Sequence, residues 1–242
     1  MNKVMVLYQL DPIRILTVFV AQGLVFAFFL FLAIKILKRD TKRLNLIFSA
    51  FYIFAIIGSF VNFVYIFLTD VPTILVLNFI TNYCIFYAPT FLFVFNLILL
   101  KSEMVMTTSK QLIIFVIYGI AMFGTIIFYF TPIPGVTLNP NFSPVWSIHF
   151  FIYLLIAETA LILPLLYLSF QVYRKFEDIN LKKKWKFFIF GFCALSLFMY
   201  GIFVSNTLDN PTFRTIISAV GVILGLAGGY LMYYGVGRQI EK

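Results

Sequence analysis

Seven long apolar stretches constrain this chain more than any other feature of its sequence. A helix needs roughly 20 apolar residues to cross a hydrocarbon layer about 30 Å thick, and each stretch is long enough. Short breaks that carry Pro, Asn, Asp or clustered Lys separate them. The sequence therefore predicts an all-α, seven-transmembrane-helix bundle forming one domain, 1–242, with helices at 13–37, 44–68, 73–100, 111–131, 148–173, 186–206 and 213–236.

The composition excludes a water-soluble domain. Of the 242 residues, 62% are hydrophobic and 11% are charged, and a soluble domain of that composition would aggregate. The first apolar run is too long for a signal-peptide core and has no small-residue cleavage site before Lys38, so we expect a retained helix. We expect a multi-pass protein of the cell membrane in contact with the lipid bilayer.

The basic residues predict how the chain is threaded. Fifteen of the 18 Lys and Arg residues fall on alternate connections, and the other side holds Lys3, Arg14 and Arg214. By the positive-inside rule the amino end lies outside and the carboxyl end lies in the cytoplasm. This threading accounts for the net charge of +9 without a nucleic-acid partner.

The connection 132–147 contains four prolines and no Lys, Arg, Asp or Glu. We expect it to form an ordered cap or a shallow interfacial loop. Trp146 and Tyr129 flank it, and aromatic residues at this level usually anchor helices at the headgroup boundary, so that is the role predicted for both.

Glu158 is an acid near the middle of the membrane. It lies about ten residues into the fifth predicted helix, which corresponds to a depth of about 15 Å. A charged acid there costs several kcal/mol, so it should face the bundle interior and be protonated, hydrogen-bonded or paired. Two interpretations remain open: a ligand contact, proton site or switch, or a neutral acid that holds two helices together. His149 lies on the opposite side of the same helix.

Asn78, Asn82, Pro89 and Asn96 form one stripe along the third predicted helix. Exposing amide side chains to lipid costs free energy, so the stripe marks the buried side of the helix. Pro89 should interrupt the backbone hydrogen bonds there. The stripe indicates either interhelical hydrogen bonding or a pocket lined by Asn78, Asn82 and Glu158. The ligand-binding or switch candidates are Glu158, Asn78, Asn82, Asn62 and Tyr200.

Gly221, Gly225 and Gly229 repeat at four-residue spacing in the seventh predicted helix. Such a small-residue face lets a neighbouring backbone come close. We expect helix packing inside the bundle, with a homodimer as the alternative.

No motif in the sequence indicates catalysis. His149 is the only histidine, Cys84 and Cys193 lie in apolar runs, and no phosphate-binding glycine loop is present. The last apolar run, 213–236, has no lysine for a retinal Schiff base. We therefore expect no enzyme, catalytic residue, metal or cofactor.

A weak internal repeat suggests a duplicated three-helix unit. An offset of 139 residues aligns Lys35 with Arg174, Asp70 with Asp209 and Pro72 with Pro211. Such parallel repeats would suit a small-solute transporter or channel with a site near the bilayer midplane.

Four segments carry a resemblance that covers nearly the whole chain. They are the basic turn 38–43, the Tyr- and Pro-containing run 82–93, the connection at 173–174 and 181–186, and the exit segment 230–238. Together they resemble the seven-transmembrane sensor region that precedes bacterial and archaeal histidine kinases and diguanylate cyclases. The resemblance implies a sensor or receptor that responds to an unknown small ligand, from outside or dissolved in the membrane. No kinase or cyclase region lies in these 242 residues, so we expect a separate cytoplasmic signalling partner.

Overall fold

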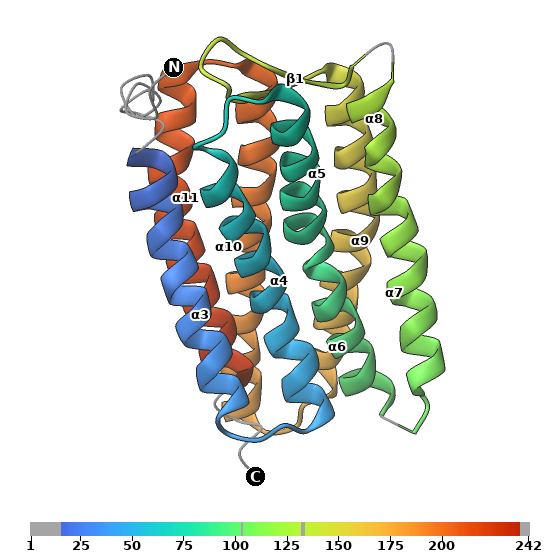
Figure 1. Cartoon of the computed structure of the whole chain (residues 1–242). Helices are drawn as coiled ribbons and strands as arrows, with labels where there is room; N and C mark the ends of the chain where they lie inside the picture. The colour runs from blue at the N-terminus through green and yellow to red at the C-terminus, as the bar shows by residue number, and fades with distance from the viewer. Residues whose placement is uncertain (1–15, 103, 132–133, 238–242) are drawn as a thin grey trace.

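The computed structural model describes residues 16–102, 104–131 and 134–237, and most of these are helical. The helices run nearly parallel to one axis, and a small hairpin lies across one end (Figure 1). The elements are η1 (Leu16–Gln22), α3 (Gly23–Leu37), α4 (Arg43–Tyr65), α5 (Val71–Tyr87), α6 (Pro89–Lys101), α7 (Thr108–Phe123), η2 (Gly124–Ile126), α8 (Ile127–Phe130), β1 (Val136–Leu138), β2 (Pro144–Trp146), α9 (Ile148–Lys175), α10 (Ile179–Leu208), α11 (Pro211–Met232) and η3 (Tyr233–Gly237).

Seven helical spans within the described residues are long and apolar enough to cross a membrane, which confirms the predicted number of spans. Large apolar side chains remain exposed on their outer faces, for example Ile120 on α7 and Ile223 on α11. Water would not tolerate so many exposed apolar side chains, whereas lipid would. The chain therefore has the character of a multi-pass membrane protein. The spans are Val18–Leu37, Arg43–Tyr65, Val71–Lys101, Thr108–Phe130, Ile148–Lys175, Ile179–Leu208 and Pro211–Val236.

The third span is interrupted, as Pro89 predicted. The α-helix α5 ends at Tyr87, and α6 begins at Pro89. Proline has no backbone N–H and its ring collides with the preceding turn, so the hydrogen-bond ladder is interrupted at Ala88. Because Ala88 and Pro89 are both buried, the break lies inside the bundle and away from lipid.

The predicted start of the sixth helix at Lys186 is wrong by about two turns. The helix α10 begins at Ile179, after Asp178, whose side chain accepts a hydrogen bond from the backbone N–H of Asn180 at 2.8 Å. Lysines are good helix formers, so Lys182, Lys183 and Lys184 remain helical after the helix has left the apolar layer.

The connection before α9 is an ordered cap, as predicted. The strands β1 and β2 pair antiparallel, with Val136 opposite Trp146. The role of headgroup anchor predicted for Trp146 and Tyr129 is wrong, because these residues are only 2% and 3% exposed. The hairpin folds back over the bundle end, and Trp146 packs on Phe150 and Phe203 instead of facing the headgroups.

The predicted glycine face packs within the bundle. A methyl group added at Gly221 would lie 2.0 Å from the ring of Phe198, and one at Gly229 would lie 2.8 Å from the ring of Phe29. Gly225 faces Val25 in the same way. The three glycines therefore contact side chains of neighbouring helices within the bundle. The homodimer alternative stays a prediction.

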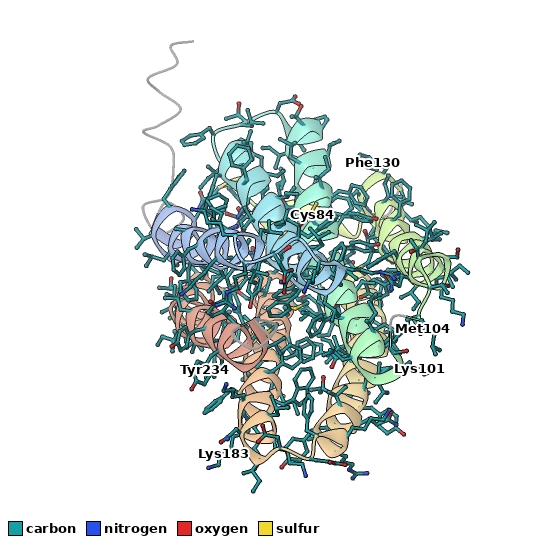
Figure 2. All side chains as sticks on the ribbon, turned by 90° about the horizontal axis from the view of Figure 1, so that it is seen from below. Cys84, Lys101, Met104, Phe130, Lys183 and Tyr234 are labelled. Carbon is teal, nitrogen blue, oxygen red and sulfur yellow. The ribbon has the colours of Figure 1, made fainter. Side chains whose placement is uncertain are left out.

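Aromatic side chains fill the bundle at the end opposite the hairpin. Phe48, Phe95 and Phe188 are fully buried, and the rings of Phe48 and Phe95 lie 5.2 Å apart. Figure 2 views the bundle from this end, where Lys101 and Lys183 lie at the periphery and side chains occupy the interior. All described Lys and Arg residues except Arg214 gather towards this end, which we call the basic end.

Candidate functional site: an elongated cavity beneath the hairpin

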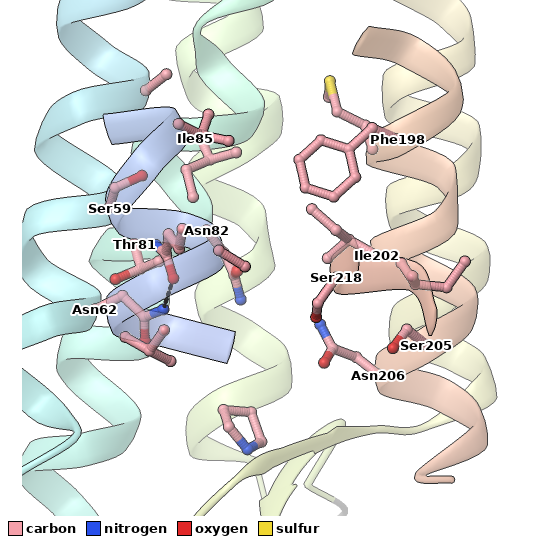
Figure 3. Close-up of a pocket in the computed structure, with 18 of the residues that line it drawn as sticks. Ser59, Asn62, Thr81, Asn82, Ile85, Phe198, Ile202, Ser205, Asn206 and Ser218 are labelled. Atoms are coloured by element: carbon pink, nitrogen blue, oxygen red, sulfur yellow. Dashed lines mark hydrogen bonds between the residues drawn. The ribbon is translucent and has the colours of Figure 1, made fainter. Parts of the chain in front are cut away.

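A cavity of about 340 Å3 separates two groups of helices in the half of the bundle nearest the hairpin. Its walls come from η1 and α3, α4 and α5 on one side, and from α10 and α11 on the other (Figure 3). The hairpin loop supplies Asn139, Asn141, Ser143 and Pro144 at one end. This volume lies at the lower limit of pockets that hold small organic ligands.

The cavity is long. Its lining on α10 runs from Leu195 to Asp209, and fourteen residues of helix rise about 20 Å. The cavity is therefore elongated along the helix axes.

The cavity wall changes from apolar to polar along its length. On α10, Phe198 and Ile202 give way to Ser205 and Asn206 towards the hairpin (Figure 3). The other walls follow the same direction: apolar side chains line the deep end, and amides and hydroxyls line the end nearest the hairpin. The deep wall includes Phe29, Phe51, Ala55, Ile85 and Leu195, and the polar wall includes Gln22, Ser59, Asn62, Asn78, Thr81, Asn82 and Ser218.

Arg214 and Asp209 form an ion pair at the mouth, with Nη2 and Oδ1 3.1 Å apart. Asp209 adopts the left-handed conformation at the end of α10, which Asp tolerates better than most residues. Arg214 also donates to the carbonyl of Pro144 at 2.7 Å, and Asn139 donates to Asp209 at 3.2 Å. These contacts tie the hairpin to α10 and α11, and the paired charges leave the mouth without a net charge.

The asparagines predicted to be functional reach this cavity. Asn78 and Asn82 line it and belong to a network in which Asn82 donates to Tyr129 at 2.7 Å and Asn78 donates to Tyr65 at 3.0 Å. Asn62 lines it as well and donates to Gln22 at 2.6 Å. Asn78 and Asn82 therefore join helices and also line the cavity.

Asn96, the other amide of the stripe, forms hydrogen bonds away from the cavity. It accepts a hydrogen bond from Ser169 of α9 at 3.0 Å and donates to the carbonyl of Leu92. It does not line the cavity, so hydrogen bonding between helices accounts for it.

Two polar groups in the cavity wall are buried without a hydrogen-bond partner among the described residues. One is the hydroxyl of Thr81, a residue only 4% exposed, and the other is Nε of Arg214. Figure 3 shows Thr81 beside Asn82 on one side of the cavity. Both atoms are enclosed by protein atoms and do not face the open cavity, so each carries the cost of about 1–3 kcal/mol of an unsatisfied buried polar atom.

The alternative in which Glu158 lines one pocket with Asn78 and Asn82 is wrong, because Glu158 does not line the cavity. Glu158 is fully buried, as expected, but it lies in a second polar cluster where Tyr118 donates to its Oε1 at 3.1 Å. Tyr200, the remaining candidate, bonds to Thr159 at 2.9 Å and does not line the cavity either. The angular position of Glu158 on its own helix was predicted correctly, but the sequence does not say which neighbouring helix an acid faces.

Arg214 and Thr81 were not among the predicted site residues. Arg214 did stand out as a basic residue on the side that otherwise holds almost none. Thr81 directly precedes Asn82, but a threonine in an apolar helix usually bonds to its own backbone and gives no separate signal. Comparison with protein-family models, with curated proteins and with solved structures finds no match to this chain.

Proposed function

We propose that this protein is a membrane sensor that binds a small molecule in the cavity beneath the hairpin and relays its presence to a separate cytoplasmic signalling partner. The observation that carries the proposal is a cavity that has exposed lining residues at the hairpin end and buried aromatic side chains at its other end. By the positive-inside rule, the basic end faces the cytoplasm and the hairpin faces outside.

The filled basic end argues against an open channel, one form of the runner-up. An open channel needs a continuous path through the bundle, and here Tyr52, Phe48 and Phe188 are fully buried below the cavity floor. Tyr52 also donates to the carbonyl of Gly229 at 3.0 Å, which joins α4 to α11 across that region. An occupant that pushes the two helix groups apart would therefore shift the contact between α4 and α11. The buried aromatic side chains packed below this contact would transmit the shift to the basic end.

A cavity that can be filled covalently gives a direct test. We would replace Cys84 and Cys193 with alanine, introduce Ser205→Cys, and modify the purified protein in nanodiscs with hexyl methanethiosulfonate. The expected result is a change in hydrogen exchange of the segments 38–42 and 176–179 at the basic end, reversed by a reducing agent. Reversal shows that the protein has stayed folded.

Ile57→Cys provides the matched control, because Ile57 lies on the exposed face of α4. Modification there should leave exchange at the basic end unchanged. Identical exchange with and without modification at Ser205→Cys would contradict the relay. Movement of an encapsulated solute out of liposomes that contain only this protein would favour the transporter.

A further inference from the structure

The cavity wall also identifies a class of ligand, an inference that rests on the proposed function. We propose that the natural occupant is an uncharged amphiphile with a single hydrocarbon chain, whose oxygen-bearing head lies beneath the hairpin and whose chain points towards the aromatic floor. The elongated shape and the change from an apolar to a polar wall along it give this orientation.

The hydrocarbon end of the ligand is defined by the floor of the cavity. Phe29 and Phe51 are 6% and 5% exposed, and the lining near them includes Ala55, Leu195 and Phe198. Carbonyl and amide groups of a ligand would lose their water there without gaining a partner, whereas an aliphatic chain would lose only unfavourable contact with water.

The head of the ligand is defined by the polar wall nearest the hairpin. Amides at Asn62, Asn82 and Asn206 and the hydroxyl of Ser218 line this part of the cavity. Amides and hydroxyls supply both donors and acceptors, so a hydroxyl or ester oxygen of the ligand would find hydrogen-bond partners there.

The charges at the mouth exclude a charged head. Arg214 is already paired with Asp209 at 3.1 Å, so a carboxylate would meet the Asp209 carboxylate and an ammonium would meet the Arg214 guanidinium. The rest of the polar wall consists of amides and hydroxyls, which supply no compensating charge. Desolvating a charged head in this place would therefore be unfavourable.

Photolabelling in nanodiscs tests this class. Three diazirine-bearing probes of equal chain length would be compared: a monoacylglycerol, a fatty acid and an alkyltrimethylammonium. We expect the monoacylglycerol to label the cavity segment of α10 at least about tenfold more than the others, since an unpaired buried charge costs well over 1.4 kcal/mol. Equal labelling by all three probes, or labels confined to lipid-facing Leu197 and Val204, would overturn the proposal.

A substitution at the mouth sharpens the test. Asp209→Asn leaves the Arg214 charge unbalanced and should shift the preference to the fatty acid. An unchanged preference for the monoacylglycerol would contradict the argument from the paired charges.

The two proposals can fail separately. If modification at Ser205→Cys alters exchange at the basic end but the probes show no preference for an uncharged head, the sensor proposal stands and the ligand class is wrong. If the monoacylglycerol is preferred but filling the cavity leaves the basic end unchanged, the cavity binds an amphiphile without relaying it.

Discussion

Glu158 is a buried acid that shares its environment mainly with tyrosines. Tyr118 donates to Oε1, whereas Oε2 has no hydrogen-bond partner among the described residues. A second pair, Thr159 with Tyr200, lies beside it on α9 and α10. A buried polar pair is most costly when half of it is removed, because the remaining group then loses its only partner. Comparing the stability of a variant that lacks one partner with that of a variant that lacks both therefore tests whether Glu158 has a packing role.

We expect Tyr118→Phe to lower the free energy of unfolding by about 1–3 kcal/mol, because it leaves the Glu158 carboxyl without its hydrogen-bond donor. Adding Glu158→Leu should restore most of the loss, since an apolar pair needs no hydrogen bond. Tyr167→Phe is the control, because Tyr167 lies on the lipid-facing surface at 64% exposure. Equilibrium unfolding in mixed micelles measures all three variants. A double variant less stable than Tyr118→Phe alone would contradict a packing role.

At the scale of the elements, α10 and α11 approach each other closely. A methyl group at Gly191 would lie 2.5 Å from the carbonyl oxygen of Gly228 and 2.8 Å from the backbone nitrogen of Met232. Backbone atoms cannot yield as a flexible side chain does, so any larger residue at Gly191 must push the helices apart. The same pair of helices forms one wall of the cavity.

We expect Gly191→Ala to destabilise the protein by about 1–3 kcal/mol through this steric conflict. Gly201→Ala is a matched control on the same helix, since its methyl group would lie 3.4 Å from the side chain of Ile217, an ordinary contact. Alanine also favours the helix, so Gly201→Ala should be neutral or slightly stabilising. Equal losses in the thermal midpoint of both variants would show that the close approach at Gly191 does not limit stability.

The sequence predicted the spans well because each span is a local property of length and hydrophobicity. The break at Pro89 and the buried positions of Asn78, Asn82 and Glu158 follow from the same local rules. The cavity depends instead on how α10 and α11 are placed against α4 and α5. That placement arises from contacts such as Gly191 with Gly228, which no periodicity in one helix can reveal.

At the scale of the whole molecule, charge is distributed unequally between the two ends. Within the described residues the hairpin end holds Arg214 as its one Lys or Arg, whereas the turn before α4 alone contains Lys38, Arg39, Lys42 and Arg43. Because cytoplasmic loops retain Lys and Arg, this distribution predicts one orientation in the membrane. The direction from which a ligand enters the cavity depends on that orientation.

We expect Asn141→Cys in the hairpin loop to react with a membrane-impermeant maleimide on intact cells. Lys183→Cys at the basic end should react only after the cells are permeabilised. Both variants would be made with Cys84 and Cys193 replaced by alanine, and that parent protein is the control. The reverse pattern would show that the threading is inverted. Labelling of both variants on intact cells would show that Asn141 and Lys183 lie on the same side, which contradicts a single crossing by α9 between them.

The contacts of Arg214 with Asp209 and Pro144 hold the hairpin over the cavity. The ion pair is partly exposed, so water and salt can reach it. Arrival and departure of an occupant both require these contacts to open, whereas the interior below them determines the equilibrium. Raising the ionic strength screens the ion pair and should therefore accelerate entry and escape together. The residence time of the guest would then shorten while its dissociation constant hardly moved.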